Sequence, residues 1–223
     1  MSASKSVNIK KLASIAMLSA VAFAVMYLSK MVPILVAGFL RPDFKDVIIV
    51  ISGLIFGPLS AAAVAIISSF IEMVTISTTG PIGFVMNVIS SCTFCCIASV
   101  FYSKNRKLSS AILGLVVGVI TVTIVMLLWN YILVPVYTPT ISRSAVASML
   151  FPIFLPFNLL KYGINAALSM LLYKPLIVGL RKAKLVNERS DGNKGKINLG
   201  VTVVSIFLIL TLVLLFLILA KVI

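Results

Sequence analysis

The chain has 223 residues, of which 61% are apolar, and its 19 Lys and Arg against five Asp and Glu give a formal net charge of +14. Such a charge would ordinarily suggest a nucleic-acid-binding protein, but aromatic residues are not interleaved with the basic ones as that surface requires. The mean hydropathy of +1.20 indicates a multi-pass membrane protein instead. We therefore expect the lipid bilayer, and no nucleic acid, as a partner.

The basic residues concentrate in short clusters between the apolar runs. Three clusters stand out: Lys5, Lys10 and Lys11; Lys104, Arg106 and Lys107; and Lys174, Arg181, Lys182 and Lys184. This is the positive-inside distribution, which predicts that all three clusters and the N-terminus face the cytoplasm from the plasma membrane.

The apolar runs predict the membrane helices in chain order, since about 20 residues of helix cross a bilayer. The first span covers 12–31, and a polar stretch at 33–46 follows it. The apolar run 47–74 is too long for one span, and Gly57-Pro58 divides it into a short helix and a longer one. The later spans are 84–102, 112–134, 154–172 and 201–220.

These spans predict an all-α integral membrane protein, with a six-helix transmembrane bundle and a seventh, C-terminal transmembrane helix. The expected parts are a basic cytoplasmic N-terminus (1–11), a membrane domain (12–180), a polar cytoplasmic linker (181–198) and the additional hydrophobic helix (199–223). Four crossings separate the first two basic clusters and two more separate the second from the third, so all three lie on one side.

Several kinds of chemistry are excluded or disfavoured by composition. The chain contains no His, which removes imidazole catalysis and the commonest zinc sites. It also lacks a phosphate-binding P-loop motif. Cys92, Cys95 and Cys96 form a C-x-x-C-C pattern inside a span, which suits a redox or metal site but is better explained by helix packing. We expect no enzyme activity, no catalytic residue, no metal and no cofactor.

Polar residues inside the spans are candidates for ligand binding, because a charge in hydrocarbon is costly unless it is paired or hydrated. Lys161 is the clearest case, and Asn158, three residues earlier, shares its helical face. Asn130 follows Trp129 in the outer part of another span. Amides and an ammonium suit a neutral, hydroxyl-rich ligand with carbonyls. Alternatively, Lys161 extends to the interface and the amides join helices.

Two loops on the non-cytoplasmic side suit the same ligand. The segment with Phe39, Leu40 and Asp43 mixes aromatic and charged residues as a lid would, and Asp46 belongs either to this lid or to the N-cap of the next helix. The hydroxyls and backbone N–H groups of 78–83 could bind a flat heteroaromatic ring, although ordinary turn chemistry also explains this loop.

Small residues line one face of the first predicted helix. Ala16, Ala20 and Ala24 recur every four residues. Such a row lets another helix approach closely, either from a partner protein or from within the same bundle.

These motifs together resemble the substrate-binding S components of the energy-coupling-factor (ECF) vitamin transporters, and the riboflavin type in particular. The resemblance covers about residues 8 to 180 and is carried by the alanine row, by 39–46, 53–59 and 79–83, and by Asn130-Tyr131 and 156–161. It implies riboflavin as the transported ligand, a pocket near the outer face, a lid, and docking through the alanine row to a transmembrane coupling subunit with two ATP-binding subunits. The implied riboflavin-binding residues are Phe39, Leu40, Asp43, Thr79, Gly80, Pro81, Ile82, Gly83, Asn87, Trp129, Asn130, Asn158 and Lys161.

Two departures from the family pattern leave alternatives open. Phe84 stands where an acidic residue is expected, and the seventh apolar run is not part of the family core. The chain could be an S component for another vitamin or a structural assembly subunit without a ligand. A self-sufficient secondary carrier would need an ion-coordinating group in the membrane, for which Glu72 is the candidate, although it lies near enough to a loop to reach water.

Overall fold

The computed structural model describes residues 9–38, 40–137, 141–182 and 199–221. This part of the chain is helical almost throughout, and it confirms the predicted fold class. The elements are α1 (Ile9–Met31), α2 (Lys45–Phe56), α3 (Pro58–Thr75), α4 (Gly80–Asn105), α5 (Leu108–Tyr137), α6 (Arg143–Met149), the π-helical segment η1 (Leu150–Phe154), α7 (Leu155–Lys182) and α8 (Leu199–Leu219).

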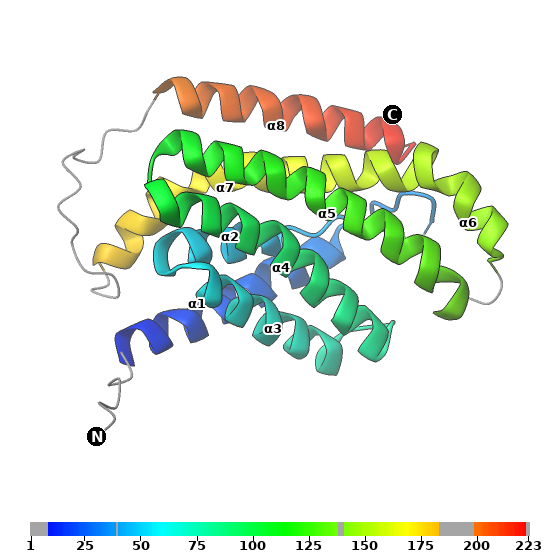
Figure 1. Ribbon diagram of the computed structural model, residues 1–223, viewed down its shortest axis with the longest axis horizontal. Helices are drawn as coiled ribbons and strands as arrows, with labels where there is room; N and C mark the ends of the chain where they lie inside the picture. The colour runs from blue at the N-terminus through cyan, green and yellow to red at the C-terminus, as the bar shows by residue number, and fades with distance from the viewer. Residues whose placement is uncertain (1–8, 39, 138–140, 183–198, 222–223) are drawn as a thin grey trace.

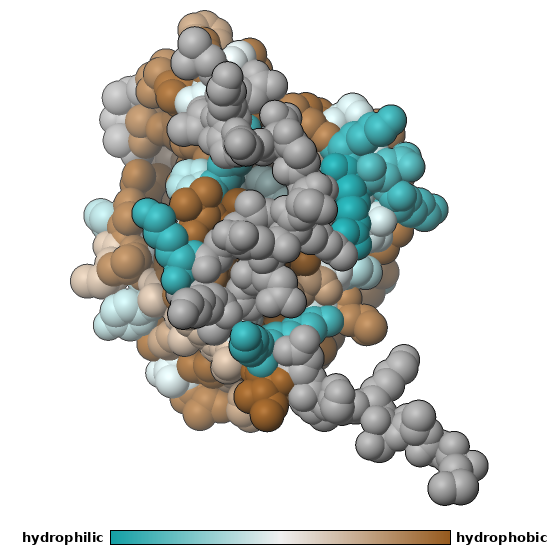
Figure 2. Space-filling view, turned by 90° about the vertical axis from the view of Figure 1, so that its left-hand side faces the viewer, coloured by the Kyte–Doolittle hydropathy of each residue, from teal (hydrophilic) through white to brown (hydrophobic). Residues whose placement is uncertain are grey.

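The long helices lie roughly side by side and give the molecule two ends (Figure 1). We call one the basic end; it holds the start of α1, the turn between α4 and α5, and the close of α7. Figure 2 looks onto this end, where patches of hydrophilic residues lie among hydrophobic ones. Its described basic residues are Lys10, Lys11, Lys104, Arg106, Lys107, Lys174 and Lys182. We call the opposite end the far end.

Helix α2 is short and central. Its 12 residues extend about 18 Å, less than the ~30 Å hydrocarbon core of a bilayer. Every residue from Lys45 to Leu54 is nevertheless buried, because α1, α3, α4 and α7 pack around this helix. Gly57 ends α2 with φ 95°, a conformation that glycine adopts without strain, and Pro58 begins α3. The predicted division at Gly57-Pro58 therefore holds.

Helices α4 and α5 form an antiparallel pair held close by two glycines. A Cβ added at Gly114 would lie 2.9 Å from the carbonyl oxygen of Ala98, and one at Gly118 would lie 2.9 Å from that of Phe94. Only glycine permits this approach, which maximises van der Waals contact between helices that lipid does not push together. The G-x-x-x-G spacing of these residues is a packing signal that the sequence prediction did not use.

The sixth predicted span, 154–172, proves to be part of a longer helical stretch. It begins at Arg143 in α6, passes through η1, and continues along α7 to Lys182. Pro152 and Pro156 lack the N–H that an α-helix requires, so the backbone widens into a π-helical turn instead of ending.

Helix α8 lies against α7 and forms the edge of the bundle (Figure 1). Its Phe216 ring stacks near Phe157, with centroids 6.0 Å apart, and Leu212 approaches Gly163. Apart from Ser205 and Phe216, its described side chains are partly or fully exposed. Six helical stretches are long and apolar enough to cross a membrane, namely α1, α3, α4, α5, α6 to α7, and α8.

Candidate functional site

Six charged side chains that are at least partly buried gather toward the far end, on α1, α2, α3, α7 and the segment before α2, and the exposed Arg41 lies beside them with a hydrogen bond to the Lys30 carbonyl. We call these six the charged cluster: Lys30, Asp43, Lys45, Asp46, Glu72 and Lys161. It contains every acidic residue of the described chain, since the other two, Glu188 and Asp191, lie outside the described residues. Three positive and three negative groups therefore meet in one part of an otherwise apolar bundle.

Glu72, near the end of α3, is the centre of this cluster. Its Oε1 accepts a hydrogen bond from Lys30 Nζ at 2.7 Å, and its Oε2 accepts from Lys45 Nζ at 2.9 Å and Asn87 Nδ2 at 2.8 Å. The Glu72 side chain is 7% exposed and that of Lys45 is 1% exposed. The expectation that Glu72 simply reaches water is wrong, because two ammonium groups and an amide surround its carboxylate.

Asp43 connects the segment before α2 to both α2 and α7. Its Oδ1 accepts a hydrogen bond from the Lys45 N–H at 2.9 Å, and its Oδ2 lies 3.5 Å from Lys45 Nζ. Burial alone would raise the pKa of Asp43, but the Lys45 and Lys161 ammonium groups outweigh it and hold that pKa below its usual value. Asp43 is therefore a carboxylate at neutral pH.

Asp46 lies in the first turn of α2 and is not its N-cap residue. The N-cap residue of α2 is Phe44, and the Asp46 Oδ1 accepts a hydrogen bond from Ser91 of α4 at 2.5 Å. The N-cap alternative for Asp46 is thus wrong. The second carboxylate oxygen of Asp46 is buried and has no hydrogen-bond partner among the described residues.

On α7, two asparagine side chains donate hydrogen bonds to backbone carbonyls. Asn158 donates to the Phe154 carbonyl at 2.7 Å, which stabilises the widened turn of η1. Asn165 donates to the carbonyls of Asp43 at 2.9 Å and Lys161 at 2.8 Å, so it anchors the segment before α2. The Asn165 Oδ1 is buried and has no partner among the described residues. The Lys161 Nζ lies 5.0 Å from the ring centroid of Tyr162.

Trp129 and Asn130 lie on α5 at the edge of this region. Trp129 packs against the apolar cluster that includes Tyr162 and Phe94, and Asn130 is buried. The Trp129 Nε1 is buried without a hydrogen-bond acceptor among the described residues. Buried indole N–H groups usually find a partner, so an unpaired donor at this position is unusual.

The predicted lid lies over the far end of α7. Val36 and Leu40 exchange two backbone hydrogen bonds of 2.9 and 3.0 Å, which fold the segment back on itself. Val36 and Leu40 then pack with Phe157 on α7. Phe39, also predicted for the lid, lies outside the described residues.

The second predicted loop makes its described hydrogen bonds within itself. The N–H groups of Thr79 and Gly80 donate to Ser77 Oγ at 3.2 and 3.1 Å. Pro81 and Ile82 are exposed, and Gly83 is buried against the Thr79 side chain. Turn chemistry thus accounts for these groups, and a role of 79–83 in ligand binding stays a prediction.

The two small-residue motifs have different surroundings. Ala16, Ala20 and Ala24 are all exposed on α1, so this row does not pack inside the described bundle. Cys95 is buried between α2 and α4, and Cys96 Sγ lies 3.5 Å from the Pro58 carbonyl oxygen. Helix packing accounts for both thiols. A docking role for the alanine row stays a prediction.

The structure brings the predicted residues Asp43 and Lys161 together in the charged cluster, but their role in ligand binding stays a prediction. Sequence reasoning missed four residues that contact the cluster or the segment before α2. These are Lys30, Lys45, Ser91 and Asn165. A signal existed for Asn165, which lies four residues after Lys161 on the same helical face. The others pair with residues 42, 27 and 45 positions away, and sequence spacing carries no information about such contacts.

Comparison with known proteins decides the family. Residues 10–173 match the family model described as "ECF transporter, substrate-specific component". The chain belongs to this family. The resemblance inferred from the sequence is confirmed, and the family consists of transporter components rather than enzymes. S components are multi-pass membrane proteins, in agreement with the six apolar helical stretches.

Individual relatives cover most of the chain. The riboflavin transporter FmnP of Bacillus subtilis is 31% identical, across 80% of this chain and 99% of that protein. The riboflavin transporter RibU of Streptococcus thermophilus is 35% identical, across 76% of this chain and 83% of its own. A solved S component of a bacterial ECF transporter is 30% identical with a TM-score of 0.64, and it covers 77% of this chain and 98% of its own. The S-component match ends before α8.

Proposed function

We propose that this S component binds riboflavin at the far end of the bundle. The supporting observation concerns three of the five buried polar side-chain atoms that have no partner in the described chain: the acceptors Asp46 Oδ2 and Asn165 Oδ1 and the donor Trp129 Nε1. The other two are the hydroxyls of Ser52 and Ser69. Buried polar groups are normally hydrogen-bonded, so unmatched ones indicate a missing partner. Riboflavin offers ribityl hydroxyls and ring N–H to the acceptors and ring carbonyls to the donor.

The predicted pocket residues Asn130, Asn158 and Lys161 complete this proposal. Asn158 and Lys161 lie on α7 near Asn165, and Asn130 follows Trp129 on α5. Riboflavin is neutral, which suits a region where the charged side chains already balance one another. The names of the relatives from three bacteria, all riboflavin transporters, support the same ligand.

The orientation and the partners are also proposals. By the positive-inside rule the basic end faces the cytoplasm, and the charged cluster therefore lies toward the outer face. Capture of riboflavin would then occur from outside. Energy would come from partners, namely a transmembrane coupling subunit and two ATP-binding subunits, with the exposed alanine row of α1 as the docking surface.

A riboflavin titration tests the ligand. Trp129 is the single tryptophan of the chain, so its fluorescence reports on the proposed pocket directly. We expect quenching by riboflavin in the wild type and affinity lowered by about tenfold or more in Asn130→Leu, the range of one lost hydrogen bond in a buried site. Asn105→Leu, the same change at an exposed position of α4, is the matched control. Absence of quenching and of co-purified flavin in a folded protein would reject the proposal.

A reconstitution experiment separates the proposal from a secondary carrier. The isolated chain in liposomes should bind riboflavin without accumulating it, with or without an ion gradient. Concentrative uptake by the lone chain would favour the carrier. Binding of a different vitamin with higher affinity than riboflavin would keep the S-component role and change only the ligand.

A further inference from the structure

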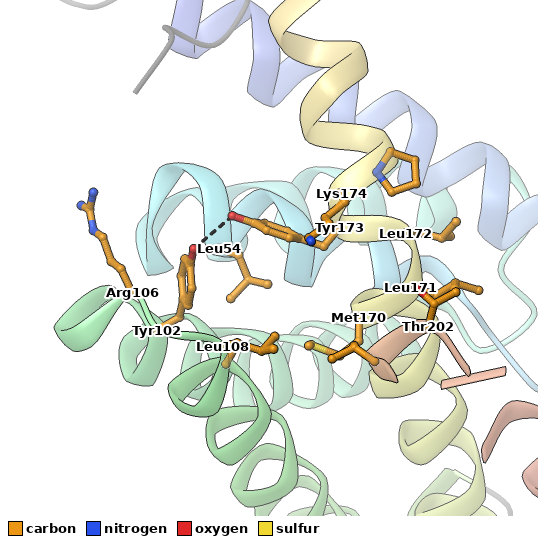
Figure 3. A pocket seen from close by; sticks show the side chains of 13 residues that line it. Leu54, Tyr102, Arg106, Leu108, Met170, Leu171, Leu172, Tyr173, Lys174 and Thr202 are labelled. Carbon is orange, nitrogen blue, oxygen red and sulfur yellow. Dashed lines mark hydrogen bonds between the residues drawn. The ribbon is translucent and has the colours of Figure 1, made fainter. Parts of the chain in front are cut away.

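A cavity lies at the basic end, away from the charged cluster. It has a volume of about 370 Å³ and is enclosed by α2, α4, α5, α7 and α8 (Figure 3). Tyr102, Arg106 and Lys174 supply polar groups to its wall, while Leu54 and Met170 supply apolar ones. We propose that this cavity binds the headgroup of an anionic phospholipid from the adjacent leaflet.

The depth of the cavity matches the headgroup region. The Tyr102 and Tyr173 hydroxyls are 3.1 Å apart and hydrogen-bonded, and their rings meet edge to face with centroids 6.2 Å apart (Figure 3). Tyrosines concentrate at the membrane–water boundary, where the ring lies in apolar surroundings and the hydroxyl in polar ones. This pair therefore places the cavity at the boundary.

The charge of the basic end selects the sign of the headgroup. Arg106 and Lys174 line the cavity, and the acidic side chains of the described chain all belong to the charged cluster at the far end. The described part of the basic end is therefore net positive. Basic pockets between membrane helices on this side suit anionic headgroups.

Arg106 also occupies a left-handed backbone position that usually holds glycine. It is the C-cap of α4 with φ 48° and ψ 23°, in the left-handed region. Glycine is the usual residue at such a helix end because any side chain adds strain there. An arginine in this conformation puts a positively charged residue on the lining of the cavity at the expense of backbone stability, and its guanidinium extends away from the other labelled side chains (Figure 3).

An apolar groove continues from this cavity into the membrane. The groove has a volume of about 600 Å³ between α5, α7 and α8, and it shares Met170 and Val201 with the cavity. Along α8 it extends from Gly200 to Leu212, about 18 Å of helix. One leaflet of hydrocarbon is about 15 Å deep. A headgroup in the cavity therefore places one acyl chain along this groove.

Native mass spectrometry of the full chain tests the proposal with phosphatidylglycerol and phosphatidylcholine of identical acyl chains. We expect the wild type to retain phosphatidylglycerol about tenfold more than phosphatidylcholine. Arg106→Gly combined with Lys174→Gln should reduce this preference to about twofold or less. Arg106→Gly also relieves the left-handed strain, so loss of selectivity should occur without loss of thermal stability. Lys10→Gln on α1, which does not line the cavity, should leave the preference unchanged.

Two outcomes would overturn the proposal. One is equal retention of both lipids by the wild type. The other is an undiminished preference in the double variant, which would assign selectivity to the diffuse positive charge of the basic end. Val201→Trp supplies an independent measurement, because a bulky side chain where cavity and groove meet should displace bound phosphatidylglycerol by about tenfold. Retention unchanged in a folded Val201→Trp protein would equally contradict the site.

Discussion

Helices α2 and α8 are both largely apolar, but only α2 carries charges, and the two helices have opposite surroundings. Helix α2 begins with Lys45 and Asp46, and it is buried from its first residue to Leu54. Helix α8 has 21 residues without a single charge, yet most of its described side chains are exposed. In a water-soluble protein a helix as apolar as α8 would be inside, and charges such as those of α2 would face the solvent.

The difference follows from the solvent. Lipid is as apolar as leucine, so nothing drives α8 out of contact with it, and packing alone holds the helix to α7. A charge in hydrocarbon is costly, so the charges of α2 are placed inside the protein, where Glu72 and Ser91 neutralise or hydrogen-bond them. Burial of Lys45 and Asp46 therefore reflects polarity that the protein must satisfy, and the apolar residues that follow them in α2 are buried with them.

Removal of Glu72 should cause the largest loss of stability, because it removes a partner of the buried charge on α2. Glu72→Ala leaves Lys45 buried with Asp43 as its remaining ion pair, and removing one partner of a buried pair costs about 3–5 kcal/mol. Thermal unfolding in detergent would measure the loss. Lys30→Ala, whose side chain is 29% exposed, should cost clearly less. Equal melting of Glu72→Ala and wild type would show that water already solvates Lys45.

Lys161→Ala tests whether the charges that surround α2 also serve the ligand. We expect riboflavin binding to weaken by about 1.5–3 kcal/mol, the value for a hydrogen bond to a charged group. Trp129 fluorescence would give the dissociation constant, and Lys10→Ala at the basic end is the control. An unchanged constant in a folded variant would remove Lys161 from the site and leave it a structural partner of Asp43.

Ala20→Trp tests whether the exposed alanine row of α1 is a docking surface for a partner protein in the membrane. Because Ala20 is exposed on α1, the fold and riboflavin binding should be unaffected, with stability within about 0.5 kcal/mol of wild type. Transport and co-purification of the coupling subunit should be lost, because the docking row needs small side chains. A melted protein that no longer binds riboflavin would mean that the row packs internally.

The smallest effect is expected on α8. Leu210 is 60% exposed, so Leu210→Ala should change stability by no more than about 0.5 kcal/mol. The buried Phe216→Ala on the same helix is the matched comparison and should cost more, because it removes the contact with Phe157. Equal losses from both variants would indicate that α8 is covered by something other than lipid.

The helices were largely predictable because apolar runs of membrane length leave few alternatives. The first span, predicted at 12–31, is α1 at Ile9–Met31, and the division at Gly57-Pro58 is where α2 ends and α3 begins. The stretch from Arg143 to Phe154 was not predicted. Its polar start and the prolines at 152 and 156 suggest a loop, and only tertiary packing keeps such a segment helical.

The charged cluster was only half predictable. Lys161 could be recognised because a charge in an apolar run is conspicuous by itself. Its surroundings could not, because Glu72 and Lys30 are 42 residues apart and meet through the packing of α1 against α3. The Asn87 Nδ2 donates a hydrogen bond to Glu72, a contact that was not predicted, and the role of Asn87 in ligand binding stays a prediction. A charged residue in an apolar run can be recognised from the sequence alone, but the residue that pairs with it is determined by the whole fold.

The equal numbers of positive and negative groups in the charged cluster have an electrical consequence. Membrane potential acts on net charge, at about 2.3 kcal/mol per elementary charge per 100 mV. Three lysines and three carboxylates carry a formal charge of zero, so voltage exerts no net force on the cluster as a unit. Movement of these six groups alone across the field is therefore electrically silent, whereas Arg41, which donates a hydrogen bond to the Lys30 carbonyl, adds a positive charge when it moves with them. Replacing Glu72 by Gln would leave one unbalanced positive charge and make that movement sensitive to voltage.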